Sequence, residues 1–84
     1  MTQVTLNFWA GARAAAGMTS ETVEAVSVGE ALDVVLTRHA DDRFTRVIRA
    51  SSLLVDGIAA SEGTLRRPLE GATVVEVLPP FAGG

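Results

Sequence analysis

Two segments of alternating apolar residues, one near each end of the chain, most constrain how it can fold. Near the start, Val4, Leu6 and Phe8 are separated by single residues, and near the end Val75 and Val77 repeat the pattern. A period of two is typical of a strand with one buried face. If these two strands pair in parallel, the chain between them has to cross over one face of the sheet. The alternation therefore predicts a mixed sheet with its connection packed on one side.

One main helix is predicted in that connection. Ser27 is followed three residues later by Glu30, which is the spacing of a capping box at a helix start. From Val28 onward the apolar residues keep helical spacing, so the helix should end near His39. Residues 20–26 are rich in Thr and Val and predict a second strand, which forms a hairpin with the first. The helix is thus expected to lie across one face of the sheet.

Only short elements are predicted between this helix and the last strand. The dipeptide Asp56-Gly57 is a strong signal for a tight hairpin turn, so residues 53–55 and 58–60 should form two short strands. Residues 41–49 are mostly polar and predict an irregular turn over the core. Residues 61–68 predict a loop.

Length and composition exclude several classes of protein. A chain of 84 residues forms one domain, and 48% hydrophobic residues with a net charge of −3 argue against disorder and against a basic nucleic-acid surface. The sequence has no apolar run of membrane-spanning length and no segment typical of a signal peptide. We therefore expect no membrane partner, no nucleic-acid partner and a cytoplasmic location.

Two residue types are missing, and both absences have chemical consequences. The sequence has no cysteine, so the chain cannot form a disulfide, a persulfide or a thiolate metal site, and no metal is expected. All seven basic residues are arginine. The N-terminus is then the only amine that this chain could offer to an acylating agent.

The last predicted strand, residues 73–78, is followed by two prolines. Pro79 and Pro80 lack a backbone N–H and fix φ near −65°, so the strand should end there and an extended tail should begin. The sequence therefore predicts a folded domain over residues 1–78 and a tail over residues 79–84.

The tail ends in two glycines, which suit it to enter another protein. Fully extended, the residues after Leu78 reach about 20 Å, the depth of a protein cleft. Gly83 and Gly84 have no Cβ atoms, so a partner's backbone can close tightly around them. We therefore expect the tail to deliver its terminal carboxylate into the active site of a partner.

Three segments carry a resemblance to a known family. They are Phe8-Trp9-Ala10-Gly11-Ala12-Arg13, Leu54-Val55-Asp56-Gly57 and Leu78-Pro79-Pro80-Phe81-Ala82-Gly83-Gly84. With them the chain resembles the ubiquitin-like sulfur-carrier proteins, in particular the small subunit of molybdopterin synthase. Two departures are Gly71-Ala72-Thr73, where the family commonly has Gly-Asp, and Phe81, where a smaller residue is usual. The resemblance implies an α+β fold, the β-grasp (ubiquitin-like) fold, with one main helix across a mixed sheet and a flexible C-terminal Gly-Gly tail.

The resemblance also implies a reaction. In this family an ATP-dependent, E1-like activating enzyme adenylates the terminal glycine, here Gly84, which is then converted to a thiocarboxylate (1-thioglycine). A sulfur donor protein supplies the sulfur, and the large subunit of molybdopterin synthase uses it to form the molybdopterin dithiolene. The chain itself would be a non-catalytic carrier, the small subunit of a sulfurtransferase. It would bind no cofactor, because the partner enzyme uses the ATP.

The site residues follow from this interpretation of the tail and from the alternation of strand residues between the two faces of the sheet. Gly84 is predicted to provide the reacting carbon. The tail residues predicted to lie in the partner's active site are Pro79, Pro80, Phe81, Ala82 and Gly83. Trp9 and Leu78 fall on the opposite face of the sheet from Val4, Leu6 and Phe8, so they are predicted to form an apolar partner interface at the base of the tail.

Two further residues are assigned to this interface, and an alternative stays open for Trp9. Ala59 would border the patch, and Arg13 matches a basic position of the family and would pair with an acidic partner group or remain solvated. Trp9 could instead only cover the end of the sheet or pack under residues 12–16.

Other functions are also compatible with a reactive C-terminal glycine. The chain could carry the thiocarboxylate for thiamine or cysteine biosynthesis. It could be a ubiquitin-like modifier that is joined through Gly84 to lysines of other proteins. A fourth possibility is an interaction module with a chemically inert tail.

Overall fold

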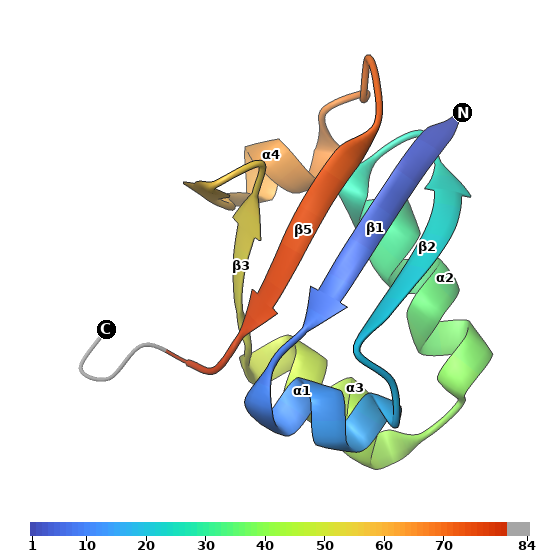
Figure 1. Ribbon diagram of the computed structural model, residues 1–84. Helices are drawn as coiled ribbons and strands as arrows, with labels where there is room; N and C mark the ends of the chain where they lie inside the picture. Colours follow the sequence, from blue (N-terminus) through green and yellow to red (C-terminus); the bar gives the residue numbers. More distant parts are fainter. Residues whose placement is uncertain (81–84) are drawn as a thin grey trace.

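The structure, a computed structural model, describes residues 1–80, and Phe81–Gly84 lie outside the described residues. Helices and strands alternate along most of this length (Figure 1). In chain order they are β1 (Thr2–Phe8), α1 (Ala10–Ala16), β2 (Ser20–Ala25), α2 (Val28–His39), α3 (Asp42–Ala50), β3 (Ser52–Val55), β4 (Ile58–Ala59), α4 (Glu62–Arg66) and β5 (Thr73–Leu78).

The strands form one mixed sheet in the order β2-β1-β5-β3-β4. The first and last strands, β1 and β5, lie next to each other inside the sheet and run parallel. Their pairing begins with Val4 opposite Thr73 and ends with Phe8 opposite Val77. The other pairs, β1 with β2, β3 with β5 and β3 with β4, are antiparallel. The predicted parallel pairing and the predicted hairpin are both confirmed.

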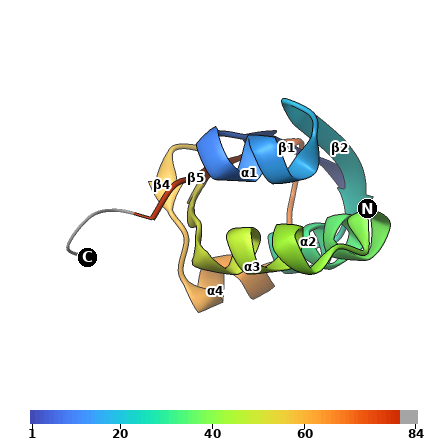
Figure 2. The ribbon, with the colours of Figure 1, turned by 90° about the horizontal axis from the view of Figure 1, so that it is seen from below.

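The helices cover one face of this sheet. Seen from below, α2, α3 and α4 form a layer beneath the strands, and α1 lies at the end of the sheet where β1 stops (Figure 2). The alternating residues of β1 and β5 point into the space between the layers and are fully buried. From α2 they meet Val28, Ala31 and Val35, which are also fully buried. The core therefore lies between the sheet and α2, as the sequence predicts.

Helix α2 begins and ends where its sequence predicts. The Ser27 Oγ accepts a hydrogen bond from the backbone N–H of Glu30 at 3.1 Å, and the Glu30 Oε1 accepts one from the N–H of Val26 at 3.2 Å. The helix ends at His39, and Ala40 follows with a left-handed φ of 48°. The cap fixes the start of the helix and so its register over the sheet.

Residues 41–49 are not an irregular turn, and this prediction is wrong. They lie mostly in α3, whose cap is Asp41: its Oδ1 accepts the N–H of Arg43 at 2.8 Å. Phe44 and Ile48 are one helical turn apart, and both are buried. The polar residues between them occupy the solvent side of the helix, so a strongly amphipathic pattern was mistaken for a loop.

Residues 61–68 are not simply a loop either, because they contain the short helix α4. Ser61 and Thr64 form a capping box in which each side chain accepts the other's backbone N–H, at 3.2 Å in both cases. Thr64 takes the place of the usual Glu or Gln. The helix packs closely on α2, since a Cβ at Gly29 would lie 3.0 Å from the carbonyl oxygen of Leu65.

The predicted hairpin of β3 and β4 is confirmed. Asp56 and Gly57 have φ values of 48° and 85°, the positive angles that a type I′ turn requires at both central positions. Asp56 also joins the hairpin to β5, because its Oδ1 accepts the N–H of Val74 at 3.0 Å and its N–H donates to the Val74 carbonyl at 2.9 Å. Among the helices of residues 1–80, none is long and apolar enough to cross a membrane.

Candidate functional site: the base of the C-terminal tail

The last described residues leave the sheet from its centre. Strand β5 ends at Leu78, which lies opposite Ser52 of β3, and the exposed Pro79 and Pro80 belong to no helix or strand. Because β1 and β5 are parallel, they end at the same edge of the sheet, and Trp9 directly follows the pair Phe8–Val77. We call the surroundings of Trp9 and Leu78 the tail base.

Trp9 is held at this position by its backbone and by its ring. Its N–H donates to the carbonyl of Val77 at 3.1 Å, and its extended backbone serves as the N-cap of α1. The indole Nε1–H donates to the Glu76 Oε1 at 2.7 Å, although 44% of the residue stays exposed. Glu76 alternates with the buried Val75 and Val77, so the ring lies on the outer face of the sheet, where strand parity places it.

Arg13 lies over the Trp9 ring. The two residues are four positions apart, and the guanidinium carbon is 5.1 Å from the centre of the indole, within the range of a cation–π interaction. The Arg13 Nε also donates to the carbonyl of Phe8 at 3.2 Å. Helix α1 therefore places a positive charge beside the exposed aromatic ring.

Glu76 and Asn7 complete this arrangement, and sequence reasoning did not identify either of them. The Asn7 Nδ2 donates to the Glu76 Oε2 at 3.0 Å, so each carboxylate oxygen of Glu76 accepts one hydrogen bond. The two residues are direct neighbours in the parallel pair β1–β5. Their signal in the sequence is weak: each is a polar residue at an outward position of a predicted strand.

The predicted interface residues are not all brought together. Leu78, which is half-buried, and Trp9 share the tail base, but Ala59 lies on β4, two strands away from β5. At the usual spacing of strands this separation is about 10 Å. The half-buried Leu54 lies between them, opposite both Ala59 and Glu76, and Val74 on β5 is 42% exposed. An apolar patch therefore extends across the outer face, and we define it as Trp9, Leu54, Ala59, Val74 and Leu78.

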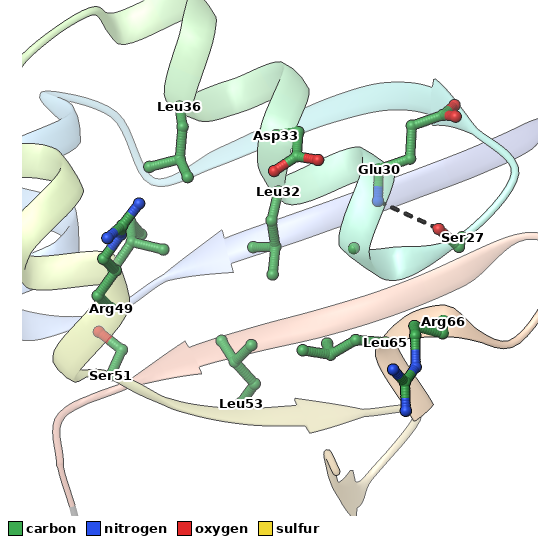
Figure 3. A pocket seen from close by; sticks show the side chains of 12 residues that line it. Ser27, Glu30, Leu32, Asp33, Leu36, Arg49, Ser51, Leu53, Leu65 and Arg66 are labelled. Carbon is green, nitrogen blue, oxygen red and sulfur yellow. Dashed lines mark hydrogen bonds between the residues drawn. The ribbon is translucent and has the colours of Figure 1, made fainter. Parts of the chain in front are cut away.

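The opposite face of the domain contains a groove. It has a volume of about 680 Å³ and lies between α2 on one side and β3 and α4 on the other (Figure 3). Four leucines line it, and Arg49 and Arg66 lie toward its two ends in this view. The leucines are Leu32, Leu36, Leu53 and Leu65. No motif of the sequence pointed to this groove.

His39, the last residue of α2, packs at the helix end that the sequence predicts near it. Its Nε2 lies 3.0 Å from the Glu21 Oε1, and its ring stacks on Phe44 with the ring centres 4.1 Å apart. These contacts join the end of α2 to β2 and α3. The histidine is thus a packing residue rather than part of the tail base.

Solved structures resemble the whole chain, although its sequence matches no protein-family model and no curated protein. Small archaeal modifier protein 1 from Methanosarcina acetivorans superposes with a TM-score of 0.80 at 20% identity, over 100% of this chain and 98% of that one. Small archaeal modifier protein 1 from Haloferax volcanii gives 0.76 at 21% identity, over 96% and 100%. Both matches extend over nearly all of each chain. The chain has the β-grasp fold.

A third β-grasp structure comes from a complex. It is the complex of subunits 1 and 2 of molybdopterin-converting factor from Helicobacter pylori, with a TM-score of 0.67 at 17% identity over 98% of this chain and 99% of that one. The predicted α+β class and ubiquitin-like architecture of the β-grasp domain are therefore confirmed. At such low identity the likeness concerns the fold. The roles predicted for Phe81, Ala82, Gly83 and Gly84 fall outside the described residues and stay predictions.

Proposed function

We propose that this chain is a sulfur carrier for molybdopterin synthesis. Gly84 is adenylated by an ATP-dependent activating enzyme, converted to a thiocarboxylate, and inserted into the large subunit of molybdopterin synthase. There it donates sulfur to the molybdopterin dithiolene. Support comes from the tail sequence Leu78-Pro79-Pro80-Phe81-Ala82-Gly83-Gly84 on a β-grasp domain, and from the complex of subunits 1 and 2 found for the Helicobacter pylori protein.

The geometry of β5 is the observation that carries this proposal. The last strand is central in the sheet, paired with β1 on one side and β3 on the other, and it ends at Leu78. The start of the tail is thus attached to a strand that is paired on both sides, while Pro79 and Pro80 are exposed. A partner that binds the domain therefore receives the tail from a fixed point.

The chemistry requires activation, because a carboxylate has no good leaving group. Attack of the Gly84 carboxylate on ATP forms an acyl adenylate and releases pyrophosphate. A sulfur nucleophile from the donor then adds to the acyl carbon, and AMP leaves. This chain contributes the reacting carbon, and its partners contribute the catalytic groups. With no cysteine and no lysine, its side chains offer neither a competing thiol nor a competing amine to the activated end.

The tail base supplies the recognition surface in this proposal. Trp9 is exposed, aromatic and fixed by Glu76 and Arg13, which are the properties of an interface anchor. Trp9 and Leu78 lie at the start of the tail, and the apolar patch extends from them across the outer face. We therefore assign the large subunit to the outer face of the sheet, with Pro79 to Gly84 entering its active site.

A second function is favoured by a different observation. Two of the similar structures are named as small archaeal modifier proteins, so the chain could be joined through Gly84 to lysines of other proteins. Carriers for thiamine or cysteine biosynthesis share the thiocarboxylate and differ only in the enzyme that accepts the sulfur. Covalent adducts with cellular proteins would support the modifier function, and free thiocarboxylate would support a carrier.

Deletion of Gly84 tests the leading proposal. We expect the shortened protein to keep its fold, because every residue of the described core precedes Pro79. It should support no molybdopterin formation when mixed with the large subunit, the activating enzyme, ATP and a sulfur donor. A control that ends in Gly84 but carries Glu70→Gln, at an exposed residue outside the tail and the tail base, should remain active. Molybdopterin formation by the shortened protein at the wild-type rate would refute the proposed mechanism.

A further inference from the structure

Helices α1 and α3 together form the end of the domain at which β1 and β5 stop (Figures 1 and 2). Helix α1 begins at Ala10, just after β1, and α3 ends at Ala50, two residues before Ser52, which lies opposite Leu78. The two helices are in contact, since a Cβ at Gly11 would lie 3.8 Å from the Val47 Cγ1. The surface of α1 and α3 is therefore adjacent to the tail base.

Four of the chain's seven arginines lie on these two helices. They are Arg13 on α1 and Arg43, Arg46 and Arg49 on α3, and all four are exposed. Within residues 1–80, the ion pairs join Glu21 to Arg38 and to His39, and none involves these four. We call the four the tail-side arginines.

The charge of the chain is distributed unevenly. Residues 9–17 and 41–52 contain the four tail-side arginines and two carboxylates, Asp41 and Asp42, both at the start of α3. The rest of the sequence contains the other three arginines and the other eight carboxylates. A chain with a net charge of −3 thus has a basic end, and this end lies beside the start of the tail.

Helix stability does not account for the positions on α3. Positive charges stabilise the last turn of a helix and oppose the dipole in its first turn. Arg43 lies in the first turn of α3 and Arg46 in its middle; only Arg49 lies in the last turn. Phe44 and Ile48 already provide the buried face of the helix. Arg43 and Arg46 therefore contribute neither to the buried face of α3 nor to favourable interactions with its dipole.

We infer that the tail-side arginines dock on an acidic protein surface that flanks the cleft receiving the tail. This inference rests on the proposed function and adds that the partner's surface beside the cleft is acidic. A protein fits better than a nucleic acid, because the exposed Trp9 and the half-buried Leu78 adjoin the basic end and the many carboxylates elsewhere would repel a polyanion. The attraction would orient the domain before contact, with the tail toward the cleft.

Such steering changes the rate of association more than the rate of dissociation. Charge complementarity can raise association rates from about 10⁵–10⁶ to 10⁸–10⁹ M⁻¹s⁻¹ at low salt. The effect fades as salt is added, because the screening length is about 8 Å at physiological ionic strength. We therefore expect association with the partner to slow markedly as salt rises.

A pair of charge reversals tests the inference. The test variant is Arg43→Glu with Arg46→Glu, and the matched control is Arg66→Glu with Arg67→Glu. Both change the net charge by the same amount, but Arg66 belongs to α4, which packs near the start of α2, whereas α3 follows the end of α2. The length of α2 separates the two sites by about 18 Å, which exceeds the screening length. Circular dichroism should show that both variants keep the fold.

The measurement is the association rate with the purified large subunit of molybdopterin synthase from the same genome, at several salt concentrations. We expect the test variant to associate at least tenfold more slowly than wild type at about 0.1 M salt, where the screening length of about 10 Å is shorter than the separation of the two sites, with the difference vanishing at about 1 M salt. The control should slow by less than threefold. Equal slowing in both variants would show that net charge alone matters, and no slowing in the test variant would also overturn the inference.

A second measurement does not depend on the large subunit. Titration of the isotope-labelled protein with poly-L-glutamate should shift the amide signals of α1 and α3, and the test variant should lose this response. Shifts centred on α4 would contradict the inference, as would a response to single-stranded RNA that exceeds the response to poly-L-glutamate. If thiocarboxylate forms on Gly84 and these measurements fail, the proposed function survives and only the docking surface is wrong. If no thiocarboxylate forms, the proposed function fails whatever poly-L-glutamate does.

Discussion

The two faces of the sheet contain apolar residues for different reasons. On the helix-covered face, Val4, Leu6 and Phe8 have an exposed fraction of 0%, and burial of such side chains stabilises the fold. On the outer face, Trp9 and Val74 remain 44% and 42% exposed. Polar residues would serve the fold equally well there. The comparison teaches that folding explains the first set, whereas the second is not required by the core and fits the partner interface that we propose.

The outer face also differs in how its side chains are held. The core residues are fixed by close packing, whereas Trp9 is fixed by a hydrogen bond to Glu76 and by the guanidinium of Arg13. Because the ring is already fixed in the free protein, less conformational entropy is lost when a partner binds it. Substitutions on the covered face should therefore change stability, and substitutions at the tail base should change binding.

The largest effect on stability is expected for Phe8→Ala. Phe8 is fully buried and meets Phe44 edge to face, with ring centres 5.8 Å apart. Loss of a buried phenylalanine costs about 3–5 kcal/mol, a large part of the stability of so small a domain. The free energy of unfolding should be measured in urea. A loss below about 1 kcal/mol would contradict the buried position of this ring.

Trp9→Ala should weaken binding to the partner and leave the stability of the domain nearly unchanged. Removal of a central aromatic anchor should weaken binding to the large subunit by about 2 kcal/mol or more, which corresponds to roughly 30-fold in the dissociation constant. The stability of the free domain should change by less than about 1 kcal/mol, because the ring is half exposed. Calorimetry of binding and urea unfolding together check both parts. Unchanged affinity would remove Trp9 from the interface.

A matched pair of glycine substitutions tests how closely α4 packs on α2. In Gly29→Ala the new Cβ would lie 3.0 Å from the Leu65 carbonyl oxygen, so α4 has to shift, at a cost of about 1–3 kcal/mol from overpacking. In Gly11→Ala the nearest atom, Val47 Cγ1, lies at an ordinary 3.8 Å. This control should gain up to about 1 kcal/mol from helix propensity. Thermal unfolding should rank the control above wild type and Gly29→Ala below the control, and equal melting temperatures for the two variants would contradict the close approach of α4.

The smallest effect is expected for Glu76, which positions the Trp9 ring. Glu76→Ala removes the acceptor of the indole N–H and should cost about 0.5–1.5 kcal/mol, whereas Glu76→Gln retains an acceptor and should cost less. Trp9 is the only tryptophan and the chain has no tyrosine, so intrinsic fluorescence reports on this one ring. Emission should shift in Glu76→Ala and change little in Glu76→Gln. Identical spectra for all three proteins would mean that Glu76 does not hold the ring.

Much of the fold could be predicted because local signals and burial agree. The alternation in β1 and β5, the cap at Ser27 and the turn at Asp56-Gly57 each identified an element correctly. Helix α3 was missed because its short apolar stripe lies among arginines, although Phe44 and Ile48 have helical spacing. Helix α4 was missed because Thr64, rather than Glu, closes its capping box.

The candidate site could be predicted in part. Parity placed Trp9 and Leu78 on the outer face, whereas Arg13 was assigned to the interface from the family resemblance, and its contact with the Trp9 ring was not predicted. Glu76 and Asn7 could not be found in this way, because their contact depends on the register of two strands far apart in the sequence. The sequence placed Ala59 at the border of the patch but not its distance from the tail, because that distance depends on the position of β3 between β4 and β5.

The most direct test is the intact mass of this protein isolated from cells that make molybdopterin. The proposed function predicts a species that ends at Gly84 and has gained the mass difference between sulfur and oxygen. The gain should disappear in cells that lack the activating enzyme, and in a variant without Gly84. A protein that shows only the unmodified mass during active molybdopterin synthesis, or that ends at another residue, would contradict the claim that its terminal carboxylate carries the sulfur.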